Sequence, residues 1–257
     1  MTTTDGKGQP ADVQMPFTSH LGELRARLIK SVLAVGVAFI GCFYYVDTIF
    51  ATLAAPLHRL KIHGLTLIGT AVTDAFFTKM KIGFVAAVIV ALPVLLWQAW
   101  QFIAPGLYEH EKRYTRSFVF AGSLFFGAGV AFCYIILIQQ GLGFLLHRYE
   151  VIGVKPMLQV NDYLSTVARL VLVTGAMFEL PVLAFFTARI GLIDHRFLIR
   201  HSRYALIAIA LLAAVLTPPD LISQVLLMVP LLLLYLVSVA VAYLARFRMN
   251  RLDRAAK

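Results

Sequence analysis

Six long runs of apolar residues alternate with short polar segments along the chain. A transmembrane helix needs roughly 20 apolar residues to cross a hydrocarbon core of about 30 Å, and it satisfies its own backbone polar groups. The runs are too uniformly apolar for the alternating strands of a membrane barrel. They predict an all-α integral membrane protein with six transmembrane helices, near residues 29–46, 75–99, 117–139, 163–189, 204–216 and 221–245.

The whole chain, residues 1–257, is expected to form a single polytopic membrane domain. Residues 1–28 form an N-terminal segment, residues 29–245 hold the six helices, and residues 246–257 are a basic tail. Residues 1–19 are polar and no cleavage site follows the first apolar run, so a cleavable signal peptide is not expected.

The fifth run is unusually short. Residues 204–216 would extend only about 20 Å as a helix, less than the hydrocarbon thickness. The sequence Thr217-Pro218-Pro219-Asp220 follows at once, where proline cannot continue the helix and Asp220 can cap the next one. This pattern predicts a hairpin that ends below the membrane surface, unless the ends of the fifth run are misplaced.

The charge distribution predicts the orientation. Composition is 60% hydrophobic and 14% charged, with mean hydropathy +0.81 and formal charge +10. Most of the 23 basic residues lie before residue 31, at 112–116, at 189–203 and after 245. Basic residues favour cytoplasmic loops, so both termini are predicted to be cytoplasmic. The same explanation removes the need for a nucleic-acid partner. Among the exceptions are three basic residues inside or beside apolar runs, Lys79, Lys81 and Arg169.

Signatures of catalysis are absent from the sequence. There is no GxxxxGK[ST] phosphate loop, no HExxH metal motif and no GxSxG nucleophile motif. His58 and His63 are more typical of loop polarity than of a metal site. Cys42 and Cys133 lie inside apolar runs and are expected to be buried filler. The chain is therefore predicted to be no enzyme and to need no cofactor or metal.

Glu179 is an acid inside the fourth apolar run, in Phe178-Glu179-Leu180-Pro181. A charge at mid-membrane costs roughly 2.5–3.5 kcal/mol on insertion scales, so this carboxyl should face protein or a water-filled cavity. Two interpretations stay open. The carboxyl either bonds a neighbouring helix or belongs to a polar site on a substrate-facing surface. Pro181 is expected to kink the helix.

Two acidic stretches lie near the predicted cytoplasmic face. Residues 20–28 read HLGELRARL, where Glu23 and Arg27 are four apart and can pair on one helix. Residues 102–113 read FIAPGLYEHEKR, which contains a Pro-Gly turn and acids within a basic loop. The acids either form local ion pairs or bind an incoming guanidinium.

Taken together, these stretches resemble the TatC family. The similarity is carried by HLGELRARL, APL, FIAPGLYEHEKR, FELP, and TPPD followed by Ser223-Gln224, in family order and over nearly the whole chain. The resemblance implies a glove-like fold with short fifth and sixth helices in the bacterial cytoplasmic (inner) membrane. It implies a receptor that self-associates, binds twin-arginine signal peptides of folded cargo, and acts with TatB- and TatA-type subunits. Export in this family is driven by the proton motive force.

The resemblance also assigns roles to residues. It places Glu23 and Glu111 among the acids that recognise the arginine pair, with Phe102 and Pro105 beside them.

Further along the chain, the resemblance makes Glu179 the intramembrane acid of the concave face. Asp220 and Gln224 match polar residues at the outer end of the last two helices, where partner helices dock. One departure concerns the sixth helix, where the family often has an acid after the aromatic. Here Leu236 follows Tyr235, so Gln224 and Ser238 would have to carry the polar contact, or the partner surface differs.

Two other classes of function fit the sequence less well. Glu179 could serve a proton-coupled transporter of small solutes, but the inverted repeats and paired broken helices of such proteins are not found. A membrane-embedded enzyme would need a catalytic pair near one membrane face, and no such pair is visible in the sequence.

Overall fold

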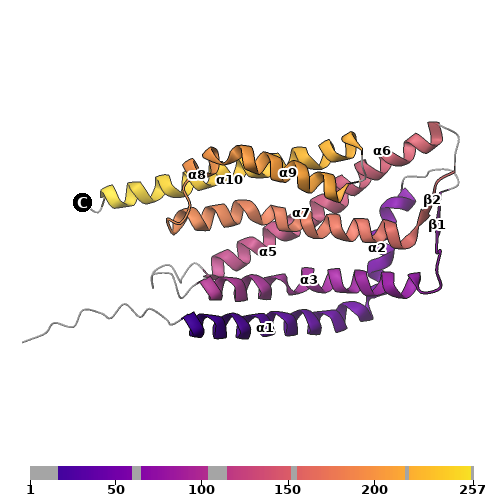
Figure 1. Ribbon diagram of the computed structural model, residues 1–257, viewed down its shortest axis with the longest axis horizontal. Helices are drawn as coiled ribbons and strands as arrows, with labels where there is room; N and C mark the ends of the chain where they lie inside the picture. Colours follow the sequence, from indigo (N-terminus) through magenta and orange to yellow (C-terminus); the bar gives the residue numbers. More distant parts are fainter. Residues whose placement is uncertain (1–16, 60–64, 104–114, 152–154, 218–219, 256–257) are drawn as a thin grey trace, which may run out of the picture.

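The computed structural model describes residues 17–59, 65–103, 115–151, 155–217 and 220–255. These residues form helices and one pair of short strands (Figure 1). In chain order the elements are α1 (Phe17–Tyr44), α2 (Val46–Arg59), β1 (Thr66–Ile68), α3 (Asp74–Ile103), α5 (Thr115–Phe132), a π-helical turn (Cys133–Leu137), α6 (Ile138–Val151), β2 (Met157–Gln159), α7 (Val160–Arg189), α8 (His195–Arg200), α9 (Ser202–Leu216) and α10 (Leu221–Ala255).

Five helical segments of the described residues are long and apolar enough to cross a membrane. They correspond to five of the six predicted runs and span Leu21–Tyr44, Asp74–Ile103, Thr115–His147, Val160–Arg189 and Leu221–Ala245. The fold class is therefore all-α, as predicted. The predicted fifth span is α9, whose 15 residues extend only about 22 Å.

The sixth helix is longer than expected. The resemblance implied that both the fifth and the sixth helices are short, and α9 is. The apolar part of the last helix has 25 residues, and α10 as a whole has 35. Pro230 lies inside α10 without ending it, and the helix continues through the basic stretch after Ala245 as far as Ala255.

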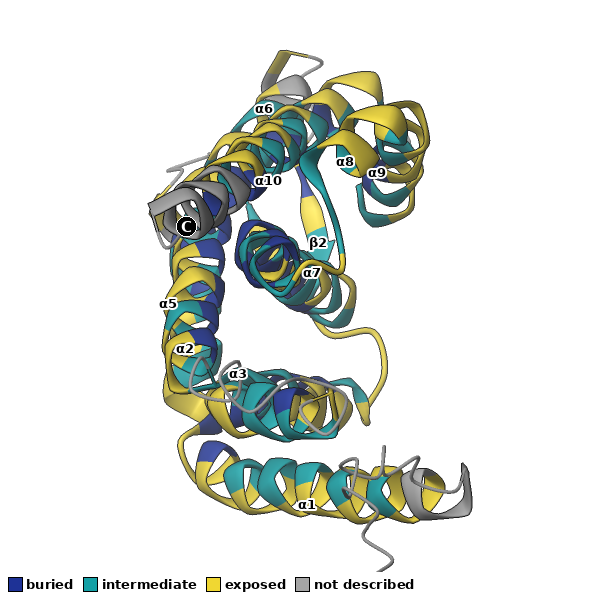
Figure 2. Ribbon diagram, turned by 90° about the vertical axis from the view of Figure 1, so that its left-hand side faces the viewer, coloured by how far each residue is buried: buried dark blue, intermediate teal, exposed yellow. Residues whose placement is uncertain are grey.

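In Figure 2, α7 lies inside a C-shaped arrangement of helices, with α10 above it, α5 to its left and α3 below it. It packs against α3, α5 and α10, while α1 lies at the edge and packs mainly on α3. Consequently α1 exposes many apolar side chains, among them Val32, Val37 and Ile40, as expected for a lipid-facing helix.

Close contact between α5 and α7 depends on two glycines. A Cβ on Gly129 would lie 2.9 Å from the Cα of Gly175, and a Cβ on Gly175 would lie 2.8 Å from the ring of Phe126. Small residues at such a crossing let two helices approach closely inside a membrane, where dispersion contacts drive packing.

One end of the bundle carries the strands and is called the strand end here. β1 and β2 pair in parallel, with Leu67 opposite Leu158, and so tie together the segments that precede α3 and α7. The opposite end, where α1 begins, is called the N-terminal end (Figure 1). The turn between α9 and α10 stops short of the strand end, as the short fifth run predicted (Figure 1).

The segment between the first two spans contains α2, which is helical through Pro56 and ends at Arg59. The third span is also longer than its apolar run, because a π-helical turn joins α5 to α6 and the helix continues to Val151. In that turn the backbone N–H of Ile138 donates to Cys133 O, five residues earlier.

Candidate functional site

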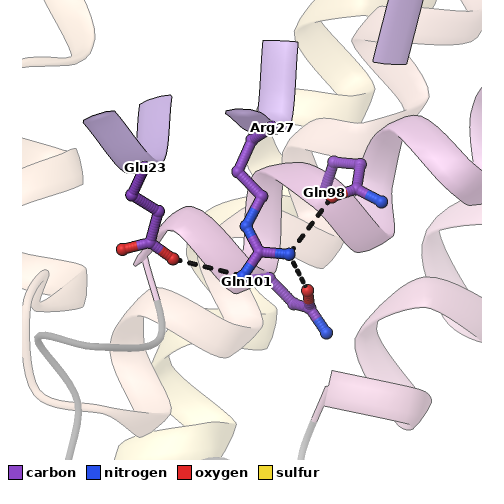
Figure 3. Close-up of polar contacts among 4 residues, drawn as sticks. All are labelled: Glu23, Arg27, Gln98 and Gln101. Atoms are coloured by element: carbon purple, nitrogen blue, oxygen red, sulfur yellow. Dashed lines mark hydrogen bonds and ion pairs between the residues drawn. The ribbon is translucent and has the colours of Figure 1, made fainter. Parts of the chain in front are cut away.

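A cluster of polar side chains joins α1 and α3 at the N-terminal end of the bundle. Arg27 donates from Nη2 to Glu23 Oε1 at 3.2 Å, one helical turn away on the same face of α1. Its Nη1 donates to Gln98 Oε1 at 3.4 Å and also to Gln101 Oε1 (Figure 3). The predicted Glu23–Arg27 pair is therefore confirmed, and the two glutamines of α3 complete it.

This cluster is an acceptor site for one guanidinium group. It offers a carboxylate and two amide oxygens, which match the planar array of guanidinium donors. The side chains of Arg27 and Glu23 are 24% and 22% exposed, so the pair is partly screened from water but reachable. We call Glu23, Arg27, Gln98 and Gln101 the guanidinium cluster.

Of the other predicted peptide-binding residues, Phe102 lies next to the guanidinium cluster. Phe102 follows Gln101 in the last turn of α3 and is partly exposed. Pro105 and Glu111 lie outside the described residues. Sequence reasoning missed Gln98 and Gln101, although two glutamines three apart near the end of an apolar run were a visible signal, since that spacing places both on one helix face.

Glu179 lies inside the protein, on the side of α7 that faces α5 and α3. Only 6% of the residue is exposed, and neither carboxylate oxygen has a hydrogen-bond partner among the described residues. A Cβ on Gly122 would lie 2.9 Å from Oε2, and 2.7 Å from Leu96 Cδ1. The glycine of α5 therefore leaves the space that this carboxyl occupies.

The carboxyl of Glu179 is enclosed by protein, as expected for an acid in an apolar span, but it forms no hydrogen bond to a neighbouring helix within the described residues. Its assignment to a concave, substrate-facing surface stays a prediction. α7 is helical through Pro181, from Val160 to Arg189, and the kink expected at this proline stays a prediction.

Asp220 and Gln224 lie together at the turn between α9 and α10. Asp220 Oδ2 accepts from the backbone N–H of Ser223 at 2.7 Å, which is the predicted cap of α10. Gln224 donates from Nε2 to Ala210 O at 3.2 Å and so ties α10 to α9. Asp220 Oδ1 and Ser223 Oγ are buried without hydrogen-bond partners among the described residues.

Further along α10, Ser238 and Leu236 lie in different environments; Leu236 stands where the family often has an acid, and Ser238 is a polar residue that could replace its contact. Ser238 is 3% exposed and donates to Leu234 O of its own helix at 2.8 Å. Leu236 is 62% exposed. Ser238 is thus not available at the surface. The polar contact to a partner would then be carried by Gln224, or the partner surface differs.

The predicted residues therefore do not form one site. Glu23 and Phe102 lie at the N-terminal end, Glu179 near the middle of α7, and Asp220 with Gln224 toward the strand end. Within the part of the chain that the structure describes, no group of three or more His, Cys, Asp or Glu side chains could hold a metal ion.

Comparison with known proteins decides the family. The sequence model of the family described as Sec-independent protein translocase protein (TatC) matches residues 19–230, which include Glu23, Glu179 and Gln224. The chain belongs to the TatC family. It is accordingly a multi-pass membrane component of the Tat export system, the Sec-independent protein translocase.

Individual TatC relatives agree over most of their length. The chain is 38% identical over 224 residues to the TatC of Desulforapulum autotrophicum, covering 87% of this chain and 83% of that one. It is 41% identical over 226 residues to the TatC of Campylobacter jejuni, covering 86% and 91%. Crystal structures of TatC, described as the twin arginine translocase receptor, include one that matches with TM-score 0.81 and 35% identity, over 88% of this chain and 99% of that one.

Proposed function

We propose that this TatC-family chain is the signal-peptide receptor of its translocase. It binds the paired arginines of a leader on folded cargo and, with TatB- and TatA-type subunits, mediates export driven by the proton motive force. The guanidinium cluster carries this proposal, because its carboxylate and amide oxygens already hold one guanidinium in the free protein.

Binding would proceed by exchange of guanidinium groups. An incoming arginine takes the Glu23 carboxylate, while Arg27 keeps Gln98 and Gln101 as acceptors. Exchanging Arg27 for an incoming arginine at the Glu23 carboxylate contributes little net binding free energy, because one guanidinium replaces another. A second acid that binds the second arginine is therefore needed. Glu111 is proposed for that role, with Phe102 and Pro105 bordering the pair. Lysine has no planar fork and would not reproduce the exchange.

The proposed orientation places both termini in the cytoplasm of a bacterium, with the protein in the inner membrane. The guanidinium cluster then faces the compartment from which cargo arrives. Arg116, Arg189, Arg196, Arg200 and Arg203 lie toward the same end of the bundle, in accord with the excess of basic residues on cytoplasmic loops. In this arrangement α9 is a short fifth span of six, in a single membrane domain.

The turn between α9 and α10 is the proposed contact for partner helices. Asp220 and Gln224 supply polar groups there, beside an exposed apolar face of α9 that includes Ile207, Leu211 and Val215. Glu179 is proposed as an intramembrane polar contact that becomes available when a helix moves. Self-association of the receptor is expected to use other surfaces of the bundle.

The test is photo-cross-linking of a leader peptide to the full chain in membranes. We expect Glu23→Gln to lower cross-linking of an RR leader about tenfold or more, because a hydrogen bond to a charged group contributes more than one to a neutral amide. Asp162→Asn removes the same charge from an exposed position at the strand end and should leave cross-linking unchanged. A KK leader should bind both the parent and Glu23→Gln weakly.

Equal cross-linking of RR and KK leaders to the parent chain would refute the proposal. So would accessibility labelling that placed Glu23 and Glu111 on opposite sides of the membrane.

A further inference from the structure

Two basic side chains inside apolar spans are not explained by the proposed receptor. Lys81 lies in α3 and Arg169 in α7, and both are exposed. Neither has a carboxylate within 4.0 Å among the described residues, whereas Lys79, two positions from Lys81, pairs with Asp47 at 2.5 Å. A cation placed in a membrane span without an acidic partner calls for a ligand.

The two cations converge on one serine of α7. Lys81 Nζ donates to Asn161 Oδ1 at 2.9 Å and to Ser165 Oγ at 3.3 Å. Arg169 Nε donates to Ser165 O at 3.3 Å. Asn161, Ser165 and Arg169 are four apart and share one face of α7. They form, with Lys81, a polar stripe that bridges α3 and α7 and offers two positive charges with neutral partners only.

The depth of this stripe matches the edge of the hydrocarbon core. α3 and α7 have 30 residues each, about 45 Å, and so exceed a core of about 30 Å by roughly 7 Å at each end. Lys81 and Arg169 lie seven and nine residues from the starts of their helices, so their Cα atoms fall roughly 3–6 Å inside the core. Long basic side chains at that depth extend toward the interface.

An apolar groove begins at the same lysine. It has a volume of about 720 Å³ and runs between α1 and α3, lined by Val32, Val35 and Phe39 on one side and by Phe84, Val88 and Leu95 on the other, with Lys81 at its end nearest the strands. From Lys81 to Leu95 the groove follows α3 for about 21 Å, longer than the half-thickness of a bilayer core.

We propose that a phospholipid of the leaflet at the strand end binds here. Its phosphate lies between Lys81 and Arg169, and one acyl chain lies in the groove. The guanidinium fork and the ammonium point charge suit phosphate oxygens, and Asn161 and Ser165 add neutral donors. Both parts of the molecule are needed, because besides Lys81 the groove is lined by apolar residues and a single hydroxyl, that of Ser31, which is a weak holder of a soluble anion.

Lipid retention by the purified full chain tests this. After delipidation, native mass spectrometry would compare phosphatidylglycerol with diacylglycerol of the same chains and with inorganic phosphate. We expect phosphatidylglycerol to be retained most, and Lys81→Gln or Arg169→Gln to lower its retention about tenfold each. Lys79→Gln removes the same charge two positions away and should retain the parent level, as should the charge-preserving Lys81→Arg.

The groove has its own matched pair of variants. Gly36 lines the groove, Gly41 does not, and a side chain added to either meets open space. Gly36→Leu should therefore lower phosphatidylglycerol retention, and Gly41→Leu should not. Size-exclusion profiles like that of the parent would show that each variant is folded.

Three results would overturn the proposal. Equal retention of phosphatidylglycerol and diacylglycerol would remove the role of the phosphate. Binding of inorganic phosphate as strong as that of the lipid would leave only an anion site. A photoreactive residue at Phe84 that captured a polypeptide in cells would show that a partner helix occupies the groove.

Discussion

Gly122 leaves room for the buried carboxyl of Glu179, so a larger residue at position 122 should lower the free energy of unfolding. In Gly122→Ala the new Cβ would lie 2.9 and 3.2 Å from the two carboxylate oxygens and 2.7 Å from Leu96 Cδ1. Ordinary van der Waals contact begins at about 3.4 Å, so both side chains must move by several tenths of an ångström or α5 must shift from α7.

The expected cost follows from that overlap. Overpacking by one methyl group in a tightly packed interior costs about 1–3 kcal/mol. Gly127 lies on the same helix, and a Cβ there meets nothing within 4 Å. Gly127→Ala should gain up to about 1 kcal/mol, since alanine is the better helix former. The two variants should therefore differ in free energy of unfolding by about 1–4 kcal/mol, in favour of Gly127→Ala.

The assay is reversible unfolding in mixed micelles, titrated with dodecyl sulfate and followed by far-UV circular dichroism. A double-mutant cycle isolates the carboxyl. In a Glu179→Ala background both oxygens are gone, so Gly122→Ala conflicts only with Leu96, the end of a flexible side chain. The cost of Gly122→Ala should fall there by at least half, which corresponds to a coupling energy of about 0.5–3 kcal/mol.

Additivity in this cycle would refute the reasoning, because it would mean that the carboxyl does not occupy the space beside Gly122. Equal stability of Gly122→Ala and Gly127→Ala would refute it too.

Three further predictions concern the bundle. Gly129→Ala should be more destabilising than Gly122→Ala, because its Cβ would meet the backbone of Gly175 at 2.9 Å; the same unfolding titration checks this. Asp220→Ala should lower the free energy of unfolding by about 0.5–2 kcal/mol through loss of the α10 cap, whereas Asp220→Asn should retain most of it. Lys79→Met should change stability by less than about 1 kcal/mol, since its ion pair with Asp47 is largely exposed; a larger loss would show that this pair is not exposed in the membrane.

Much of the fold follows from the length and position of the apolar runs. Five of the six runs became helices long enough to span a membrane, and the short fifth run became the short α9. The existence and length of a span depend on the composition of many residues, so the prediction does not depend on any single position. The helix of the fourth run passes through Pro181, as its predicted bounds required, and α2 likewise passes through Pro56.

The candidate site was predictable only in part. The Glu23–Arg27 pair follows from spacing on one helix, and the structure confirms it. Gln98 and Gln101 join it through the packing of α1 on α3, which no local pattern specifies. Likewise, the sequence showed that Glu179 must be sheltered, but only the α5–α7 crossing determines that Gly122 provides the shelter.

The π-helical turn at Cys133–Leu137 divides one long helix into two parts, α5 and α6, whose side chains face different neighbours. Its wider winding adds a residue without adding rise, which rotates everything beyond it by about 100° relative to an ordinary α-helix. Before the turn, Phe118 and Phe126 point into the bundle, and within it Tyr134 reaches across to donate to Thr52 O of α2 at 2.7 Å. Losing a single residue there would restore regular winding and redirect α6 away from α2 and α10, although no side chain of either surface had been altered.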